Sequence, residues 1–184
     1  MAQTTPTLST VSSMPRVPPQ SAEAEQSVLG GLLVDSRRWD EVAETVRSGD
    51  FYTRAHREVF SAIHALHESD NAVDVVTASE WLKNKGTLEA AGGLAYLGEL
   101  ANRTPGTTNL KAYAQIVRER SILRSLIAAA SDISEKAYQP EGLDIEALLD
   151  HAEKAVFEIS DADRRSASGF YPIQGLLTQA LDRI

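Results

Sequence analysis

The side chains of this sequence that are most able to carry out chemistry are few and scattered. The chain has four histidines and no cysteine, which excludes a thiolate zinc site, an iron–sulfur cluster and a cysteine nucleophile. His64 and His67 lie three residues apart on one predicted helix, with Glu68 beside them. Zinc-binding helices of the H-E-x-x-H type place their histidines four residues apart. We therefore interpret both imidazoles as ordinary surface groups and predict no metal site.

The glycine pairs and the carboxylates give equally little support for catalysis. Neither Gly30-Gly31 nor Gly92-Gly93 is followed by the Lys-Ser or Lys-Thr pair of a phosphate-binding loop, and no G-x-S-x-G element occurs. The acidic residues fall in predicted first turns of helices and on faces that we expect to be solvated. The sequence therefore predicts no catalytic residue and no cofactor-binding residue in this chain.

The net charge narrows the range of partners. The 184 residues include 18 Lys and Arg against 26 Asp and Glu, which gives a formal charge of −8. An acidic chain is a poor free-standing nucleic-acid-binding domain, because phosphate contacts need a basic surface. Arg118, Arg120 and Arg124 cluster on one predicted helix, but Glu119 interleaves them. We expect a solvated charged face there.

The hydropathy pattern argues against a membrane location. No apolar run approaches the ~20 residues that span a bilayer. The N-terminus also lacks the basic segment and the apolar core of a secretory signal. We expect a cytoplasmic protein that contacts no membrane.

The elements that must position these side chains are all predicted to be helices. Residues 1–20 are rich in Ser, Thr and Pro and are predicted to be a flexible tail. Residues 21–104 are predicted to form a compact helical bundle, and the only β-leaning stretch in it, 73–76, is too short to build a sheet. Helices are expected from Ser21 through Leu33, from Arg37 to Val46, from Arg54 to Glu68, and from Ala78 to Lys85 with Thr77 as cap.

Two adjacent glycines interrupt the first of these helices. Each costs a helix interior roughly 1 kcal/mol relative to alanine. Gly30 and Gly31 therefore suggest that another backbone passes close by. The alternative is a locally weak helix that tertiary packing stabilises.

Residues 105–160 are predicted to form a long antiparallel helical hairpin. No Gly or Pro occurs from about Asn109 to Tyr138, and a second helix is expected from Ile145 to Ser160. Apolar residues at spacings of three and four predict an internal seam made of Ile116, Leu123, Leu126, Leu148, Leu149 and Val156.

The hairpin carries more apolar side chains than one seam can bury. Ile122, Ile127 and Phe157 lie off the predicted seam. This surplus must meet the bundle or a second copy of the hairpin, and we favour self-association. Residues 161–171 are then predicted to be a polar linker, and residues 172–184 a short helix whose apolar stripe has no partner in the chain.

Several segments in register resemble the N-terminal part of bacterial replicative DNA helicases of the DnaB family. The resemblance covers nearly all of the chain after the tail, and the family's RecA-like ATPase domain with its Walker loop is not found in these residues. The segments are PPQSAEAEQSVLGGLLVD (18–35), DFYTRAHREVFSAIHAL (50–66), VDVVT (73–77), GGLAYLGELA (92–101), YAQIVRERSILRSLI (113–127) and LLDHAEKAVFEIS (148–160).

The resemblance implies a hexameric ring that unwinds DNA during replication, with ATP and Mg²⁺ bound by the ATPase domain. It implies that N-terminal domains pair through the hairpin and form a collar that binds primase. It also implies that the linker helix packs on a neighbouring ATPase domain, that a helicase loader acts near that joint, and that DNA is held mainly by the ATPase domain. The alternative is a stand-alone α-helical adaptor protein without a motor.

The expected contact residues come from the apolar surplus and from the resemblance. For contacts between copies of the chain, the surplus predicts Ile122, Ile127, Ile133 and Phe157. For primase contacts, the resemblance implies Glu23, Tyr96, Ile127 and Ile133. For docking on the ATPase domain, the apolar stripe and the resemblance suggest Ile173, Leu176, Leu177, Ala180 and Leu181.

Overall fold

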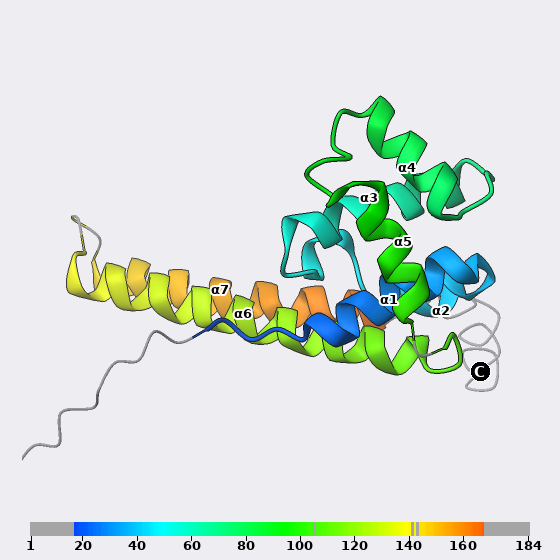
Figure 1. Ribbon diagram of the computed structural model, residues 1–184. Coiled ribbons are helices and arrows are strands. Elements are labelled where there is room, and N and C mark those ends of the chain that lie inside the picture. Colours follow the sequence, from blue (N-terminus) through cyan, green and yellow to red (C-terminus); the bar gives the residue numbers. More distant parts are fainter. Residues whose placement is uncertain (1–16, 105, 141, 143, 168–184) are drawn as a thin grey trace, which may run out of the picture.

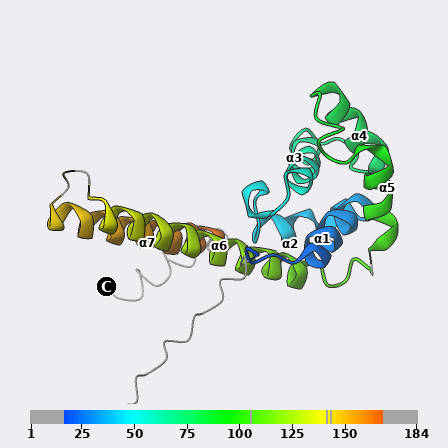
Figure 2. The same cartoon turned by 60° about the vertical axis from the view of Figure 1, so that its left-hand side comes forward.

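The computed structural model describes residues 17–104, 106–140, 142 and 144–167, and all regular structure in these residues is helical. The helices form a bundle and a long hairpin that projects from it (Figure 1). In the second view the hairpin reaches well beyond the bundle on one side (Figure 2). The prediction of an all-α fold, with a bundle followed by an antiparallel hairpin, is confirmed.

The elements follow one another without any long intervening loop. The bundle contains α1 (Ala22–Val34), α2 (Trp39–Ala43), α3 (Arg54–Glu68), α4 (Val75–Asn84) and α5 (Gly93–Arg103), with short 3-10 helices at Ser36–Arg38 and Ser48–Asp50. The hairpin consists of α6 (Leu110–Tyr138) and α7 (Ile145–Ala167).

Helix α1 lies at the centre of the bundle and packs against α3, α5 and α6. The Ser21 hydroxyl caps it by accepting a hydrogen bond from the N–H of Ala24 (3.3 Å). A helix that is buried on almost every side needs apolar or small residues all round. The buried residues of α1 are Ala24, Glu25, Ser27, Val28, Leu29, Gly30, Gly31, Leu32 and Leu33.

The two glycines of α1 are required by close packing. A Cβ atom added at Gly30 would lie 2.0 Å from the carbonyl oxygen of Leu100 in α5. A Cβ atom added at Gly31 would lie 2.3 Å from a methyl carbon of Leu110 in α6. The prediction that another backbone passes close to this helix is therefore confirmed, and that backbone belongs to α5.

Two predicted helices of the bundle have different bounds in the structure. The helix expected from Arg37 to Val46 is a 3-10 turn followed by the short α2, because the N–H groups of Thr45 and Val46 both turn back to the carbonyl oxygen of Val42 (2.9 and 3.0 Å). Helix α4 begins at Val75, before the predicted cap at Thr77. Two of the three valines in the β-leaning stretch, Val75 and Val76, are thus helical.

A capping box explains the early start of α4. The Asp74 carboxylate accepts hydrogen bonds from the N–H groups of Val76 and Thr77, both at 2.8 Å. The Thr77 hydroxyl accepts in return from the N–H of Asp74 (3.0 Å). These local bonds satisfy the free donors of the first turn and outweigh the weak strand propensity of the two valines.

Helix α6 belongs to both parts of the molecule. Leu110, Ala114, Val117 and Ser121 on its first half are buried, and beyond Ser121 none of its residues is. The first half therefore completes the bundle core, while the second half pairs with α7.

Two arginines of α6 anchor the base of the hairpin to the bundle. The Arg118 guanidinium lies 2.9 Å from the Asp50 carboxylate, and both side chains are largely buried. Arg124 donates to the carbonyl oxygens of Pro19 (2.9 Å) and Asp50, and stacks over the Tyr52 ring. The prediction of a solvated charged face was wrong for these two residues, because the chain before α1 and the 3-10 turn at Asp50 cover them.

Helix α7 is longer than predicted. It was expected to end at Ser160 and continues to Ala167, so the first seven residues of the segment predicted to be a polar linker are helical. The reason is that residues 161–167 contain neither Gly nor Pro, and a polar composition alone does not end a helix. The predicted helix 172–184 and the tail residues 1–16 lie outside the described residues.

We expect Gly30→Ala to lower the free energy of unfolding by about 3 kcal/mol, because the new methyl group overlaps a backbone carbonyl and forces α1 and α5 apart. Urea denaturation measures this change. Gly98→Ala is the matched control, since a Cβ atom there meets nothing within 4 Å. Gly98→Ala should raise the stability slightly through helix propensity. Equal effects of the two substitutions would contradict this account.

Candidate interaction surfaces

The hairpin exposes large apolar side chains on both of its helices. Phe157 is 63% exposed and Ile127 is 53% exposed. A monomeric helical protein rarely leaves so many such groups in water within one element. The exposed apolar residues of the hairpin are Leu123, Leu126, Ile127, Tyr138, Ile145, Leu149, Val156 and Phe157.

The structure divides the four residues predicted to contact another copy. Ile127 and Phe157 are exposed, whereas Ile122 and Ile133 are half-buried. All four lie on the hairpin. Their role between chains stays a prediction.

The predicted internal seam is wrong in most of its members. Leu123, Leu126, Leu149 and Val156 were expected inside the hairpin and are exposed, while Ile116 and Leu148 are half-buried. Both helices carry apolar residues on more than one face, so spacing alone did not show which face turns inward. The apolar surface that is open to a partner is therefore larger in the structure than the sequence predicted.

A polar cluster joins the two helices of the hairpin. The Asp132 carboxylate accepts from Lys136 Nζ (2.9 Å) on its own helix and lies 2.5 Å from His151 Nε2 on α7. Lys136 Nζ is also 2.9 Å from His151 Nε2. The hydrogen bond from His151, followed by that from Lys136, lowers the pKa of Asp132 below its usual value.

The lowered pKa of Asp132 makes the stability of the hairpin depend on pH in acid. The folded state favours the carboxylate, so the stabilisation is present above the pKa of the unfolded carboxyl group and is lost as pH falls through the lower folded value. We expect the wild-type protein to lose helix content as the pH falls below about 4. Asp132→Asn should flatten this acid limb in circular dichroism, and parallel acid titrations would contradict the assignment.

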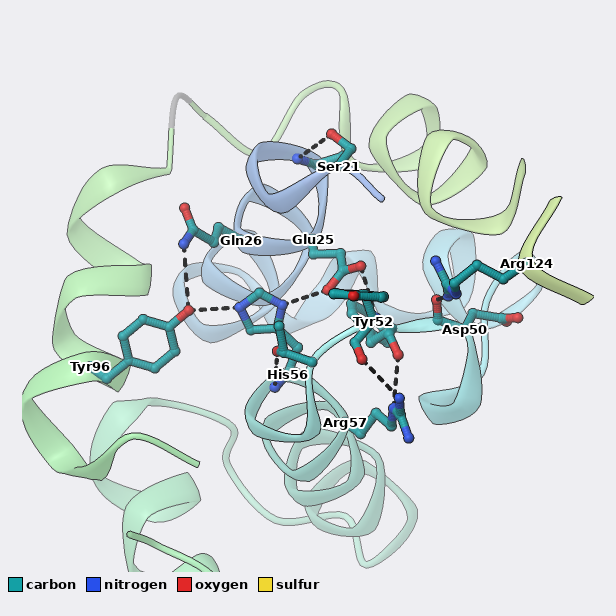
Figure 3. A network of polar contacts seen from close by, with 12 residues as sticks. Ser21, Glu25, Gln26, Asp50, Tyr52, His56, Arg57, Tyr96 and Arg124 are labelled. Carbon is teal, nitrogen blue, oxygen red and sulfur yellow. Dashed lines mark hydrogen bonds and ion pairs between the residues drawn. The ribbon is translucent and has the colours of Figure 1, made fainter. Parts of the chain in front are cut away.

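A second polar network lies between α1, α3 and α5 of the bundle (Figure 3). Glu25 of α1 and His56 of α3 are both almost completely buried, and Glu25 Oε2 lies 2.5 Å from His56 Nδ1. The other ring nitrogen, His56 Nε2, lies 2.6 Å from the hydroxyl oxygen of Tyr96 on α5. Gln26 Nε2 donates to the same hydroxyl oxygen at 3.5 Å.

The turn before α3 holds this network in place. The N–H of Tyr52 donates to Glu25 Oε1 (2.9 Å), and the Thr53 hydroxyl caps α3 by accepting from the N–H of His56 (3.1 Å). Arg57 donates to the carbonyl oxygens of Phe51 and Tyr52, both at 2.8 Å. The polar groups of the turn are thus satisfied by protein partners, which fixes the position of the imidazole.

The network ends at a surface hollow between α1 and α5. A hollow of about 280 Å³ is lined by Glu23, Gln26, Ser27, Leu100 and Arg103. Tyr96 lines a smaller adjoining hollow that shares Gln26, Leu100 and Arg103 with the first one. The structure therefore brings Glu23 and Tyr96, two of the predicted primase contacts, to the border of one surface.

The remaining predicted contact residues lie elsewhere. Ile127 and Ile133, predicted to contact primase as well, are on the hairpin and not at the α1–α5 surface. The residues predicted to dock on an ATPase domain, Ile173, Leu176, Leu177, Ala180 and Leu181, lie outside the described residues.

Sequence reasoning missed Glu25 and His56. Glu25 was interpreted only as one of the carboxylates in the first turn of the helix, but it lies three and four residues before the buried Val28 and Leu29 and shares their face of α1. His56 likewise precedes the buried Val59 by three residues on α3. A carboxylate and an imidazole on the apolar faces of two helices are the signal that would have predicted a buried pair.

Among the described residues, no group of three or more His, Cys, Asp or Glu side chains is placed to hold a metal ion. No helix in the same residues combines the length and the apolarity needed to cross a membrane.

The geometry agrees with that of a known domain class. A family model described as the DnaB-like helicase N-terminal domain matches residues 17–119. The crystal structure of the N-terminal domain of DnaB helicase from Mycobacterium tuberculosis superposes with a TM-score of 0.75 at 37% identity, and covers 77% of this chain and 99% of that one. The chain belongs to the DnaB-like helicase N-terminal domain family, which confirms the resemblance seen in the sequence.

The curated relatives are longer proteins. The replicative DNA helicase DnaB of Haemophilus influenzae is 41% identical over 168 residues, which are 91% of this chain and 36% of that protein. The replicative DNA helicase DnaC of Bacillus subtilis is 38% identical over 169 residues, which are 92% of this chain and 37% of that protein. The chain thus spans little more than a third of the length of these relatives.

A second solved structure shares the fold at lower identity. It is described as a DnaB-like replicative helicase and its interactions with primase. It superposes with a TM-score of 0.62 at 21% identity, and covers 89% of this chain and 35% of that one.

Proposed function

We propose that this chain is the N-terminal assembly domain of a hexameric replicative helicase, and that it has no catalytic site of its own. The observation that carries the proposal is the apolar surface on both helices of the hairpin, which a second hairpin would bury. The relatives that match over nearly the whole chain are replicative DNA helicases. In the complete protein, the unwinding of DNA with ATP and Mg²⁺ would belong to a separate ATPase domain.

We propose that two copies pair through their hairpins and that such pairs build the collar of the ring. The charged anchor at Asp50 fixes the base of α6, so the apolar second half of the hairpin is held in a defined position. Burial of the exposed side chains gives such a pair its stability, because each fully buried Leu, Ile or Phe contributes about 1.5–3 kcal/mol.

We expect Phe157→Asp and Ile127→Asp to shift the chain from dimer to monomer, because each places a charge in the apolar contact. Analytical ultracentrifugation over a range of concentrations measures the shift, and far-UV circular dichroism checks that the helices remain. Val76→Asp is the control, since Val76 is 66% exposed but lies on α4. A strictly monomeric wild-type chain at high concentration would overturn the proposed pairing.

We also propose that the domain binds primase. A structure with the same fold is described together with its interactions with primase. Glu23 and Tyr96 line two adjoining surface hollows between α1 and α5, while Ile127 and Ile133 would contribute from the hairpin. The two groups of residues are on different elements, so a primase domain would have to contact both the bundle and a hairpin.

The remaining partners follow from the relatives. The segment with Ile173, Leu176, Leu177, Ala180 and Leu181 is proposed to dock on the ATPase domain, and a helicase loader to act near that joint. Binding of DNA would rest mainly on the ATPase domain, in keeping with the charge of −8. A cytoplasmic location is proposed from the bacterial replicative helicases among the relatives.

We expect Glu23→Lys to weaken primase binding at least tenfold, roughly 1.4 kcal/mol, and to leave self-association unchanged. Glu23 is exposed on α1, so the fold should tolerate the substitution. Isothermal titration with purified primase measures the affinity, and sedimentation serves as the control. Unchanged affinity of Glu23→Lys would remove the α1–α5 surface from the primase contact.

A further inference from the structure

The hydrogen bonds at Glu25, the buried end of the network beneath Tyr96, have a defined donor and acceptor. A carboxylate only accepts hydrogen bonds. Glu25 is 2% exposed, its Oε1 accepts a bond from the N–H of Tyr52, and its Oε2 lies 2.5 Å from His56 Nδ1. A bond accepted at Oε2 requires a hydrogen on Nδ1 of the imidazole.

The second ring nitrogen of His56 extends this chain of hydrogen bonds to Tyr96. With a hydrogen on Nδ1, the neutral imidazole has an acceptor at Nε2, and the only group that contacts it in the described residues is the Tyr96 hydroxyl at 2.6 Å. The Tyr96 oxygen in turn accepts from the Gln26 amide (3.5 Å). In this arrangement every contact has one donor and one acceptor within the protein, so the chain of hydrogen bonds runs from Gln26 through Tyr96 and His56 to Glu25.

We propose that Glu25, acting through His56, sets the hydrogen-bond polarity of the Tyr96 hydroxyl, so that the surface between α1 and α5 presents an acceptor to a donor group of its partner. With its hydrogen directed to His56 and one lone pair taken by the Gln26 amide, the Tyr96 oxygen has its second lone pair left to accept from a partner. The matching chemistry in the partner is a Lys or Arg side chain or a free backbone N–H. Glu25 and His56 are positioning residues that touch no partner.

The surroundings of Tyr96 favour the same class of partner. Glu23 adds an exposed carboxylate beside Gln26 and Ser27. Arg103 is the basic group of this surface, and the Glu99 carboxylate pairs with it at 3.0 Å. Glu23 and the Tyr96 oxygen thus add acceptors to this surface, and these suit a donor-bearing or basic group and repel an acidic one.

Glu25→Gln tests the proposed polarity because it changes almost no volume. The carboxamide oxygen of the new residue would keep the bond from the N–H of Tyr52. Its NH₂ group would then donate to His56 Nδ1, which moves the ring hydrogen to Nε2. The Nε2–H group would donate to Tyr96, and the Tyr96 hydrogen would turn outward. A single isosteric change thus reverses the chain and converts the surface acceptor into a donor.

The imidazole nitrogens report the polarity directly by ¹⁵N NMR of the purified chain. We expect wild-type His56 to carry its hydrogen on Nδ1 and the Glu25→Gln variant to carry it on Nε2. A wild-type ring with a hydrogen on Nε2, alone or in addition to Nδ1, would overturn the proposal. This measurement needs only the wild-type chain, so it remains decisive if Glu25→Gln fails to fold.

The partner side of the inference rests on the proposed primase contact, and a double-mutant cycle tests it. We expect Glu25→Gln and Tyr96→Phe each to weaken the binding of purified primase about tenfold, and the double variant to bind no more weakly than Tyr96→Phe alone. Additive losses, or an unchanged affinity of Glu25→Gln, would show that the polarity of Tyr96 does not serve binding. If wild-type chain does not bind primase, the proposed function fails at this surface, while the NMR result still decides the polarity.

Discussion

The close approach of α1 and α5 is the constraint on which the rest of the bundle depends. Because Gly30 has no side chain, the backbone of α1 can lie directly against the carbonyl of Leu100. Because Gly31 also has no side chain, the Leu110 side chain at the start of α6 can pack directly against α1. These two contacts set the distances between three helices. They also bring Gln26 of α1 within reach of Tyr96, so the polar network depends on this spacing as well.

The parts of the fold that depend on local signals could be predicted from the sequence. The hairpin was visible because its helices are long and free of Gly and Pro, and the glycine pair indicated close backbone packing. The start of α4 was missed because its cap, which is also a local signal, was placed one turn too late. The failure there was in reading Thr77 as the cap when Asp74 holds that position.

The parts that depend on tertiary contacts were harder to predict. Glu25, His56 and Tyr96 are separated by 31 and 40 residues, and no local spacing links them. The inward face of the hairpin was misassigned because α6 and α7 are apolar on more than one side. In both cases the missing information is which surfaces meet, and single-sequence periodicity does not contain it.

The bundle and the hairpin also differ in what holds them together. The bundle has a continuous apolar core that reaches from α1 to the first half of α6. The second half of the hairpin has no buried apolar residue in the described part, and its helices are linked by the cluster of Asp132, Lys136 and His151. We therefore expect the outer hairpin to exchange its amide hydrogens faster than the bundle unless a partner covers it.

The continuity of α6 has a mechanical consequence. One unbroken helix of 29 residues runs from the bundle core to the tip of the hairpin, so no joint separates the two. Its free half, from Ser121 to Tyr138, is about 26 Å long at 1.5 Å per residue. A tilt of about 5° at the buried base would therefore swing the tip by roughly 2 Å. A small change in the orientation of α6 within the bundle would thus produce a larger displacement at the tip of the hairpin.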